Sequence, residues 1–179
     1  MKEIIYNYDL LDEKDINNKV QRVKALIINS NDEVLFGYAD KTYQLVGGHV
    51  EAGENLTNAL EREMKEESGI ILDLDNLRPF LKIKYYSRNY PKEDLNTLTI
   101  NNYFIVRTDL KPDIDKIKLT DYEKEWNYVV KYLPKDKIIE ILKNSLPEAK
   151  KKNPVLDTIE AVSEFLKQEG EDTRRDEWK

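Results

Sequence analysis

The sequence predicts an α/β protein in which a mixed β-sheet lies between helical layers. Apolar runs of strand length stand on both sides of a segment with helical periodicity, and two further helical segments close the chain. No glycine- or proline-rich linker divides its 179 residues, a length that suits one domain with a hydrophobic core. We therefore expect residues 1–168 to form a single domain, and residues 169–179, which lack apolar periodicity, to form a frayed tail.

The first strands are predicted from apolar runs that end at turn residues. Residues 20–29 (VQRVKALIIN) are typical of a buried strand, and residues 33–38 form the next strand after a polar turn. Residues 42–46 are a short strand that leads into the pair Gly47-Gly48. The N-terminal segment EIIYNYDL is either an edge strand or an inter-subunit contact, and the second alternative would make the protein a homodimer.

The second half of the chain repeats this pattern with longer strands. Apolar and polar residues alternate over residues 79–86 and 97–108, with a polar loop between them, and residues 128–133 are a further strand. A helix is expected over residues 135–146. The last helix should open with Asn153 as its cap and Pro154 at its first position. Its predicted apolar stripe consists of Val155, Ile159, Val162 and Leu166.

The helix between the two sets of strands has clear end signals. Asn55 can accept a hydrogen bond from a free amide of the first turn, and Gly69 can end the helix in a left-handed conformation. At 100° per residue, one side of this helix collects the residues Leu56, Ala59, Leu60 and Met64. That side should face the protein body.

Three carboxylates share or flank this inward side. Glu63 and Glu67 lie on it, and Glu66 lies at its edge beside Arg62. Such a group would be unstable if left bare, whereas a hard cation such as Mg²⁺ or Mn²⁺ prefers oxygen ligands and removes the repulsion. The alternative is a solvated acidic helix in a chain that is 36% charged. The spacing of these residues with their neighbours favours the metal site.

The whole run Gly48–Ile70, GHVEAGENLTNALEREMKEESGI, matches G-x5-E-x7-R-E-U-x-E-E-x-G-U at every specified position, with U an aliphatic residue. The chain thus resembles the Nudix hydrolases, and the resemblance implies a Nudix-type α/β/α sandwich with a mixed sheet. It also implies a metal-dependent pyrophosphohydrolase that cleaves a nucleoside diphosphate linked to another group. Val46 stands where many members of the family have proline, which leaves the substrate subfamily open.

The resemblance assigns roles to particular residues. Glu63, Glu66 and Glu67, with the Gly47 carbonyl, would hold Mg²⁺ or Mn²⁺ against the diphosphate. Glu54 and Arg62 would form a pair that braces the loop and the helix. In some Nudix enzymes a glutamate of the motif is the general base, here Glu67. In others it is a glutamate on a later loop, and the candidates here are Glu125, Glu123 and Glu93.

Residues outside the motif could bind the rest of the substrate. Tyr85, Tyr86 and Tyr90 are candidates for stacking on a base, although tyrosines are also common in strands for packing reasons. Arg88 in the following loop is a candidate phosphate contact. We expect a packing role for Trp126 and no chemical role for the only histidine, His49.

Composition limits the other possibilities. Without cysteine, a thiol site is excluded, and with a single histidine the composition argues against a zinc site as the basis of the chemistry. A net charge of −6 argues against nonspecific nucleic-acid binding but allows a small nucleotide as the partner. No apolar segment approaches the length of a signal peptide or membrane span, so we expect a cytoplasmic protein without membrane contact.

Two alternative functions stay open from the sequence. One is a narrower hydrolase, either a (d)NTP-sanitising enzyme or an RNA 5′-pyrophosphohydrolase. The other is a non-catalytic Nudix-fold nucleotide-binding or regulatory module, which the intact motif disfavours.

Overall fold

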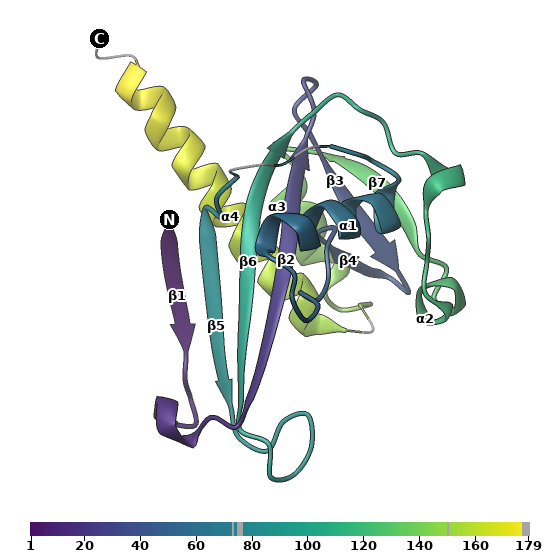
Figure 1. The fold of residues 1–179 in the computed structure, drawn as a ribbon. Coiled ribbons are helices and arrows are strands. Elements are labelled where there is room, and N and C mark those ends of the chain that lie inside the picture. The colour runs from purple at the N-terminus through teal and green to yellow at the C-terminus, as the bar shows by residue number, and fades with distance from the viewer. Residues whose placement is uncertain (73, 75–76, 150, 177–179) are drawn as a thin grey trace. The chain divides into compact units, whose positions relative to one another are not determined.

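A computed structural model describes residues 1–72, 74, 77–149 and 151–176, with the backbone only at 122, 123, 152 and 171–176. The chain forms two compact units, whose strands and helices are labelled in Figure 1. The first contains residues 1–25, 46–106 and 111–118, and the second contains residues 26–45, 107–110 and the chain from residue 119. The assignment of residues 1–168 to a single domain stays a prediction.

The first unit contains the mixed part of the sheet. Its edge strand β1 (Lys2–Tyr6) pairs in parallel with β5 (Leu81–Ser87), with Tyr6 opposite Tyr85. β5 pairs antiparallel with β6 (Thr97–Arg107), which is followed in the sheet by β2 (Asn18–Ile28). The N-terminal segment is therefore an edge strand, one of its two predicted alternatives, while dimerisation stays a prediction.

The strand pairs described for the second unit are antiparallel. β3 (Glu33–Ala39) pairs with the end of β2, with β4 (Thr42–Gln44) and with β7 (Val129–Pro134). In the described residues these pairs bring the hydrogen-bonded sheet to seven strands. The predicted α/β class with a mixed sheet is confirmed. The predicted strand 42–46 ends at Gln44, because Val46 forms only an isolated bridge with Ala25.

Helix α1 (Leu56–Ser68) belongs to the first unit and has the predicted ends. The Asn55 side chain accepts a hydrogen bond from the Asn58 amide at 2.8 Å, and Gly69 follows the helix with a φ of 70°. Two hydrogen bonds link its last turn to the segment around the short 3₁₀ helix Ile114–Lys116: from Asp113 N to Ser68 O, and from Lys118 N to Glu66 O. A second 3₁₀ helix, Glu13–Asp15, follows β1.

The helices of the second unit differ in part from the prediction. A short helix α2 (Asp121–Glu125), which the sequence analysis did not predict, precedes β7. α3 runs over Ile138–Ser145 and α4 over Lys152–Asp176. Asn153 is therefore not the cap of the last helix, and helical backbone continues into the segment expected to fray. Residues 177–179 of that expected tail lie outside the described part of the chain.

Each unit has its own apolar interior. In the first unit, Val23, Leu60, Met64, Leu81 and Phe104 are almost fully buried. In the second unit, the buried stripe of α4 consists of Val155, Thr158, Ala161, Val162 and Phe165. The predicted stripe shares two of these positions, Val155 and Val162, while Ile159 and Leu166 are half-buried. Across the described ranges, no helix combines the length and the apolar character needed to cross a bilayer.

Candidate metal and phosphate site

The loop at the start of the motif is held against β2 by backbone hydrogen bonds. Val23 N donates to Gly48 O at 3.0 Å, and Ala25 N donates to Val46 O at 2.8 Å. Between these two bonds, Gly47 has a φ of 130°, which side-chain-bearing residues rarely adopt. A Cβ atom at Gly47 would also collide with the Val23 carbonyl. The glycine is therefore required for the backbone to pass this close to β2.

Both polar groups of Gly47 are bound to charged side chains. Its amide donates to Glu67 Oε2 at 2.7 Å, in a buried position. Its carbonyl, the predicted metal ligand, accepts a hydrogen bond from the Lys24 ammonium. The Gly47 carbonyl is therefore already bound to a positively charged group of the protein, the Lys24 ammonium.

Arg62 connects the carboxylates of the motif. Its guanidinium pairs with Glu54 through two hydrogen bonds of 2.8 and 3.0 Å, so the expected bracing pair is present. It also reaches Glu63 at 2.8 Å and Glu66 at 3.3 Å, and it donates to the His49 carbonyl at 2.9 Å. The hydrogen bond from Arg62 lowers the pKa of Glu54, and Glu54 in turn raises the pKa of Arg62.

The three carboxylates predicted to bind metal differ in burial. Glu67 is 5% exposed, and the side chains of Glu63 and Glu66 are 13% and 39% exposed. Glu63 lies directly against Gly48, where an added Cβ atom would come within 2.5 Å of its carboxylate oxygen. Burial raises the pKa of Glu63, and the charges of Arg62 and Lys24 oppose that rise. Glu63 is therefore a carboxylate whose ionised form depends on nearby cations.

These donors suit a hard divalent cation in kind. The set comprises carboxylate oxygens and a backbone carbonyl, the ligands that Mg²⁺ and Mn²⁺ prefer. The Lys24 ammonium on the Gly47 carbonyl is a stand-in that indicates an attractive position for positive charge. Within the described residues, however, no three carboxylate or histidine side chains come together as a ready metal-binding cluster. Arg62 and the Gly47 amide hold the oxygens of these glutamates instead.

Two of the four predicted substrate-contacting residues, Tyr85 and Arg88, contact the N-terminal segment. The Tyr85 ring stacks on the Tyr6 ring, with centroids 5.1 Å apart and an angle of 14° between the planes. The Arg88 amide donates to the Asp9 carboxylate at 2.8 Å, and its guanidinium reaches the Asp9 carbonyl at 3.3 Å. Tyr86 is half-buried, whereas Tyr90 is exposed. Tyr85 and Arg88 thus have partners on β1 or just after it.

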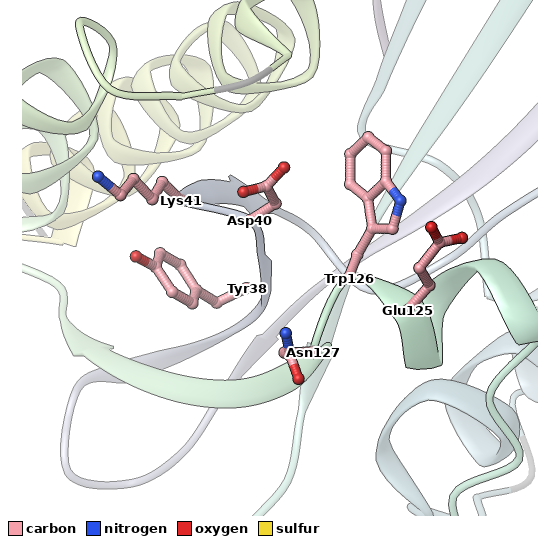
Figure 2. A pocket seen from close by; sticks show the side chains of 6 residues that line it. All are labelled: Tyr38, Asp40, Lys41, Glu125, Trp126 and Asn127. Atoms are coloured by element: carbon pink, nitrogen blue, oxygen red, sulfur yellow. The ribbon is translucent and has the colours of Figure 1, made fainter.

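Of the predicted later-loop bases, Glu125 lies in the second unit. It lines a pocket of about 370 Å³ together with Trp126 and Asn127, which follow α2, and with Tyr38, Asp40 and Lys41 (Figure 2). Lys131 Nζ lies 3.4 Å from the centre of the Tyr38 ring, and Lys151 Nζ lies 4.7 Å from that of Trp126. Glu93 is exposed in its loop, and the Glu123 side chain lies outside the described part of the chain.

Lys24 is the residue that the sequence analysis did not single out. A signal for it exists, because it is a charged residue in the otherwise apolar run VKALII of a strand predicted to be buried. His49, the neighbour of the glycine pair, is also affected by it. Burial lowers the pKa of His49, and the charges of Arg22 and Lys24 lower it further.

The chain is similar in fold to several solved structures, among which two contain a bound nucleotide ligand. The Nudix domain of NrtR from Shewanella oneidensis, complexed with ADP ribose, is 16% identical with a TM-score of 0.55, covering 88% of this chain and 95% of that chain. The MutT protein from Methanosarcina mazei Go1 is 16% identical with a TM-score of 0.53, covering 84% and 96%. A bifunctional NMN adenylyltransferase/ADP ribose pyrophosphatase from Francisella tularensis, complexed with AMP and a Mn ion, is 20% identical with a TM-score of 0.50, covering 79% and 40%.

At these identities the structural likeness shows the fold alone. No curated protein sequence matches the chain. A family model described as NUDIX domain matches residues 19–153, which is most of the chain and includes the complete motif. The chain belongs to the Nudix hydrolase family.

Proposed function

We propose that this protein is a Mg²⁺- or Mn²⁺-dependent pyrophosphohydrolase that cleaves a nucleoside diphosphate linked to another group. The observation that carries the proposal is the arrangement around Gly47: a strained loop holds a carbonyl oxygen beside a cation, next to the carboxylates of α1. A divalent cation bound there supplies positive charge for the phosphate oxygens and makes a nearby water more acidic.

The chain's own residues have distinct parts in this proposal. Glu63, Glu66 and Glu67 provide the carboxylate oxygens, and Gly47 provides the carbonyl. The Glu67 carboxylate also fixes the Gly47 amide, so that one residue both orients the loop and contributes to the site. Arg62 holds Glu54 and two of the carboxylates in place, which makes Glu54 and Arg62 positioning residues.

The substrate proposal draws on the ligands of the similar structures. ADP ribose and AMP are bound in two of those proteins, and one carries a Mn ion. We therefore place ADP-ribose first among candidate substrates, ahead of the nucleoside triphosphates that a (d)NTP-sanitising enzyme would prefer. An RNA 5′-pyrophosphohydrolase and a non-catalytic binding module are the remaining alternatives.

A substrate panel separates these possibilities. ADP-ribose, nucleotide sugars, dinucleoside polyphosphates, NADH, (d)NTPs and a 5′-triphosphorylated RNA are incubated with protein and Mg²⁺ or Mn²⁺. Phosphate is then measured after phosphatase treatment for the substrates without a terminal phosphate, and after inorganic pyrophosphatase treatment for the (d)NTPs and the RNA. Glu66→Gln and Glu67→Gln should each lower kcat on the best substrate by about 10²-fold or more while the fold is retained. Near wild-type turnover in either variant would contradict the proposal that α1 provides the metal ligands. No turnover on any compound, with retained nucleotide binding, would favour the regulatory module.

The general base is tested by comparing Glu67→Gln with Glu125→Gln. A base must lie within hydrogen-bonding reach of the attacking water, and its loss flattens the alkaline rise of kcat. Loss of a metal ligand instead raises the metal concentration that is required. We propose Glu67 as the base, because it belongs to the motif and is buried beside Gly47. A flattened pH profile in Glu125→Gln with an unchanged profile in Glu67→Gln would reverse this choice.

We name two candidate aromatic groups for binding a nucleotide. One comprises Tyr86 and Tyr90 of the first unit, and the other is the pocket of the second unit that contains Trp126 and Tyr38 (Figure 2). Tryptophan fluorescence distinguishes them in a Trp178→Phe background, where Trp126 is the single tryptophan left. Quenching by a nucleotide that disappears in Tyr38→Ala supports the pocket, and unchanged fluorescence at saturation supports the tyrosines.

A further inference from the structure

The side chain of Lys24 is directed to Gly47 by the pairing of β2 with the motif loop. The residues on either side of it, Val23 and Ala25, donate backbone hydrogen bonds to Gly48 and Val46, the neighbours of Gly47. Lys24 therefore lies opposite Gly47 in this short antiparallel pairing. Its ammonium donates to the Gly47 carbonyl, and its side chain is half-buried.

The positive charge of Lys24 acts on more than the carbonyl. It opposes the rise in the pKa of Glu63 that burial causes, and it contributes to the lowered pKa of His49. The ammonium therefore lies within electrostatic range of a predicted metal-binding carboxylate as well as on the predicted carbonyl ligand. Lys24 is a built-in monovalent cation at the position that the proposed function assigns to a divalent one.

We infer that the Lys24 ammonium and a divalent cation compete for the Gly47 carbonyl, so that Lys24 sets the metal concentration at which the site fills. The inference rests on the proposed function, because it takes Gly47 and Glu63 as metal ligands. Two positive charges that share one oxygen ligand repel each other, and this repulsion is only partly screened in a half-buried site. Metal binding then requires Lys24 to leave the carbonyl. Lys24 also offsets the repulsion among the carboxylates until that exchange occurs.

The first test measures Mn²⁺ binding to the full-length protein without substrate, from the loss of the free Mn²⁺ signal in electron paramagnetic resonance. Lys24→Met removes the charge and keeps a chain of similar shape. We expect it to lower the Kd for Mn²⁺ by about tenfold. Lys19→Met is the matched control, since Lys19 is an exposed lysine on the same strand and its change should alter Kd less than about twofold. Lys24→Arg keeps the charge and should leave the Kd near the wild-type value.

The outcomes separate this inference from the function on which it rests. If wild-type protein binds Mn²⁺ and Lys24→Met binds it equally or more weakly, the competition is overturned while the metal site stands. If neither protein binds Mn²⁺ and the substrate panel shows no hydrolysis, the proposed function itself is wrong. Lowered affinity in Lys24→Met would mean that Lys24 supports the metal site through its packing or charge.

A second measurement avoids substitution and so does not depend on the folding of any variant. The side-chain amine resonances of Lys24 and Lys19 are followed by nuclear magnetic resonance while Mg²⁺, which is diamagnetic, is added to the wild-type protein. Release from the Gly47 carbonyl should shift the Lys24 resonance in proportion to site occupancy and leave that of Lys19 in place. A Lys24 resonance that is unchanged at saturating Mg²⁺ would overturn the inference.

Discussion

Arg62 is the residue that links three of the motif's carboxylates, those of Glu54, Glu63 and Glu66. It binds Glu54 with two hydrogen bonds and reaches Glu63 and Glu66 with a third nitrogen. A planar guanidinium can do this because its donors point in fixed directions, which a lysine ammonium cannot reproduce. The guanidinium charge offsets the repulsion between Glu63 and Glu66, which share one of its nitrogens. Arg62 therefore has a structural role that is separable from any contact with substrate.

The pair between Glu54 and Arg62 predicts a pH-dependent contribution to stability. Arg62 lowers the pKa of Glu54, so the contribution is complete above the unfolded-state value of about 4.3 and is lost as the pH falls through the lowered folded-state pKa. We expect Glu54→Gln to lower the free energy of unfolding by about 1–2 kcal/mol at pH 7. Urea unfolding at pH 7, 5, 4 and 3 should show this difference shrinking below pH 4.

Glu51→Gln is the control for this series, because Glu51 is an exposed glutamate in the same loop. It should show no comparable difference at any of these pH values. A deficit in Glu54→Gln that is the same at pH 7 and pH 3 would mean that the ionised pair is not its source.

Helix α1 is fixed at both ends by single residues. Asn55 caps its first turn, and Gly69 ends it with a left-handed backbone that the Asp113 carbonyl approaches closely. The hydrogen bonds from Asp113 to Ser68 and from Lys118 to Glu66 attach the segment after β6 to the last turn. The position of Glu66 and Glu67 in this unit therefore depends on contacts outside the motif itself.

Two glycines with positive φ allow this packing to be measured. Gly53 has a φ of 86° and open space around its Cβ position, whereas a Cβ atom at Gly69 would collide with the Asp113 backbone. Gly53→Ala should cost about 1 kcal/mol, the strain of a left-handed alanine. Gly69→Ala should cost about 2–4 kcal/mol, because the collision adds to the same strain. Denaturant unfolding of both variants tests this, and equal losses would argue against the close packing at Asp113.

For the molecule as a whole, we expect the balance of charge around the proposed metal site to decide how stability and activity respond to metal. The net charge is −6, and three glutamates gather on one helix, yet Arg62 and Lys24 stand among or beside them. Internal cations of this kind reduce the cost of keeping the carboxylates ionised without an external ion. The fold should then depend much less on metal than the proposed activity does.

Chelation tests this separation of stability from activity. Excess EDTA should abolish hydrolysis of the best substrate and lower the Tm by less than about 5 °C, measured by circular dichroism. Added Mg²⁺ should restore the activity, which serves as the control for irreversible damage. Hydrolysis that persists after exhaustive chelation would contradict the proposal that activity requires metal. Loss of the cooperative melt would contradict the proposal that Lys24 and Arg62 stabilise the carboxylates without it.

Several features could be predicted from the sequence because they depend on neighbouring residues. The ends of α1 follow from Asn55 and Gly69, and the pairing of Glu54 with Arg62 follows from the spacing of the motif. Most strand positions follow from alternating or continuous apolar runs. The sequence did not predict the start of α4 at Lys152 or the residues of its buried stripe. Helix ends that have no strong local cap are decided by packing.

The sequence by itself therefore determined the family, the helix that carries the motif's carboxylates and the positions of most strands along the chain. Only the tertiary structure decided which distant groups meet: Tyr6 stacks on Tyr85 through the parallel pairing of β1 and β5, and Lys24 reaches the Gly47 carbonyl through the match between β2 and the motif loop. The physical reason is that capping and periodicity act over one or two turns of chain. Strand pairing and ion contacts join residues whose separation along the sequence carries no local signal.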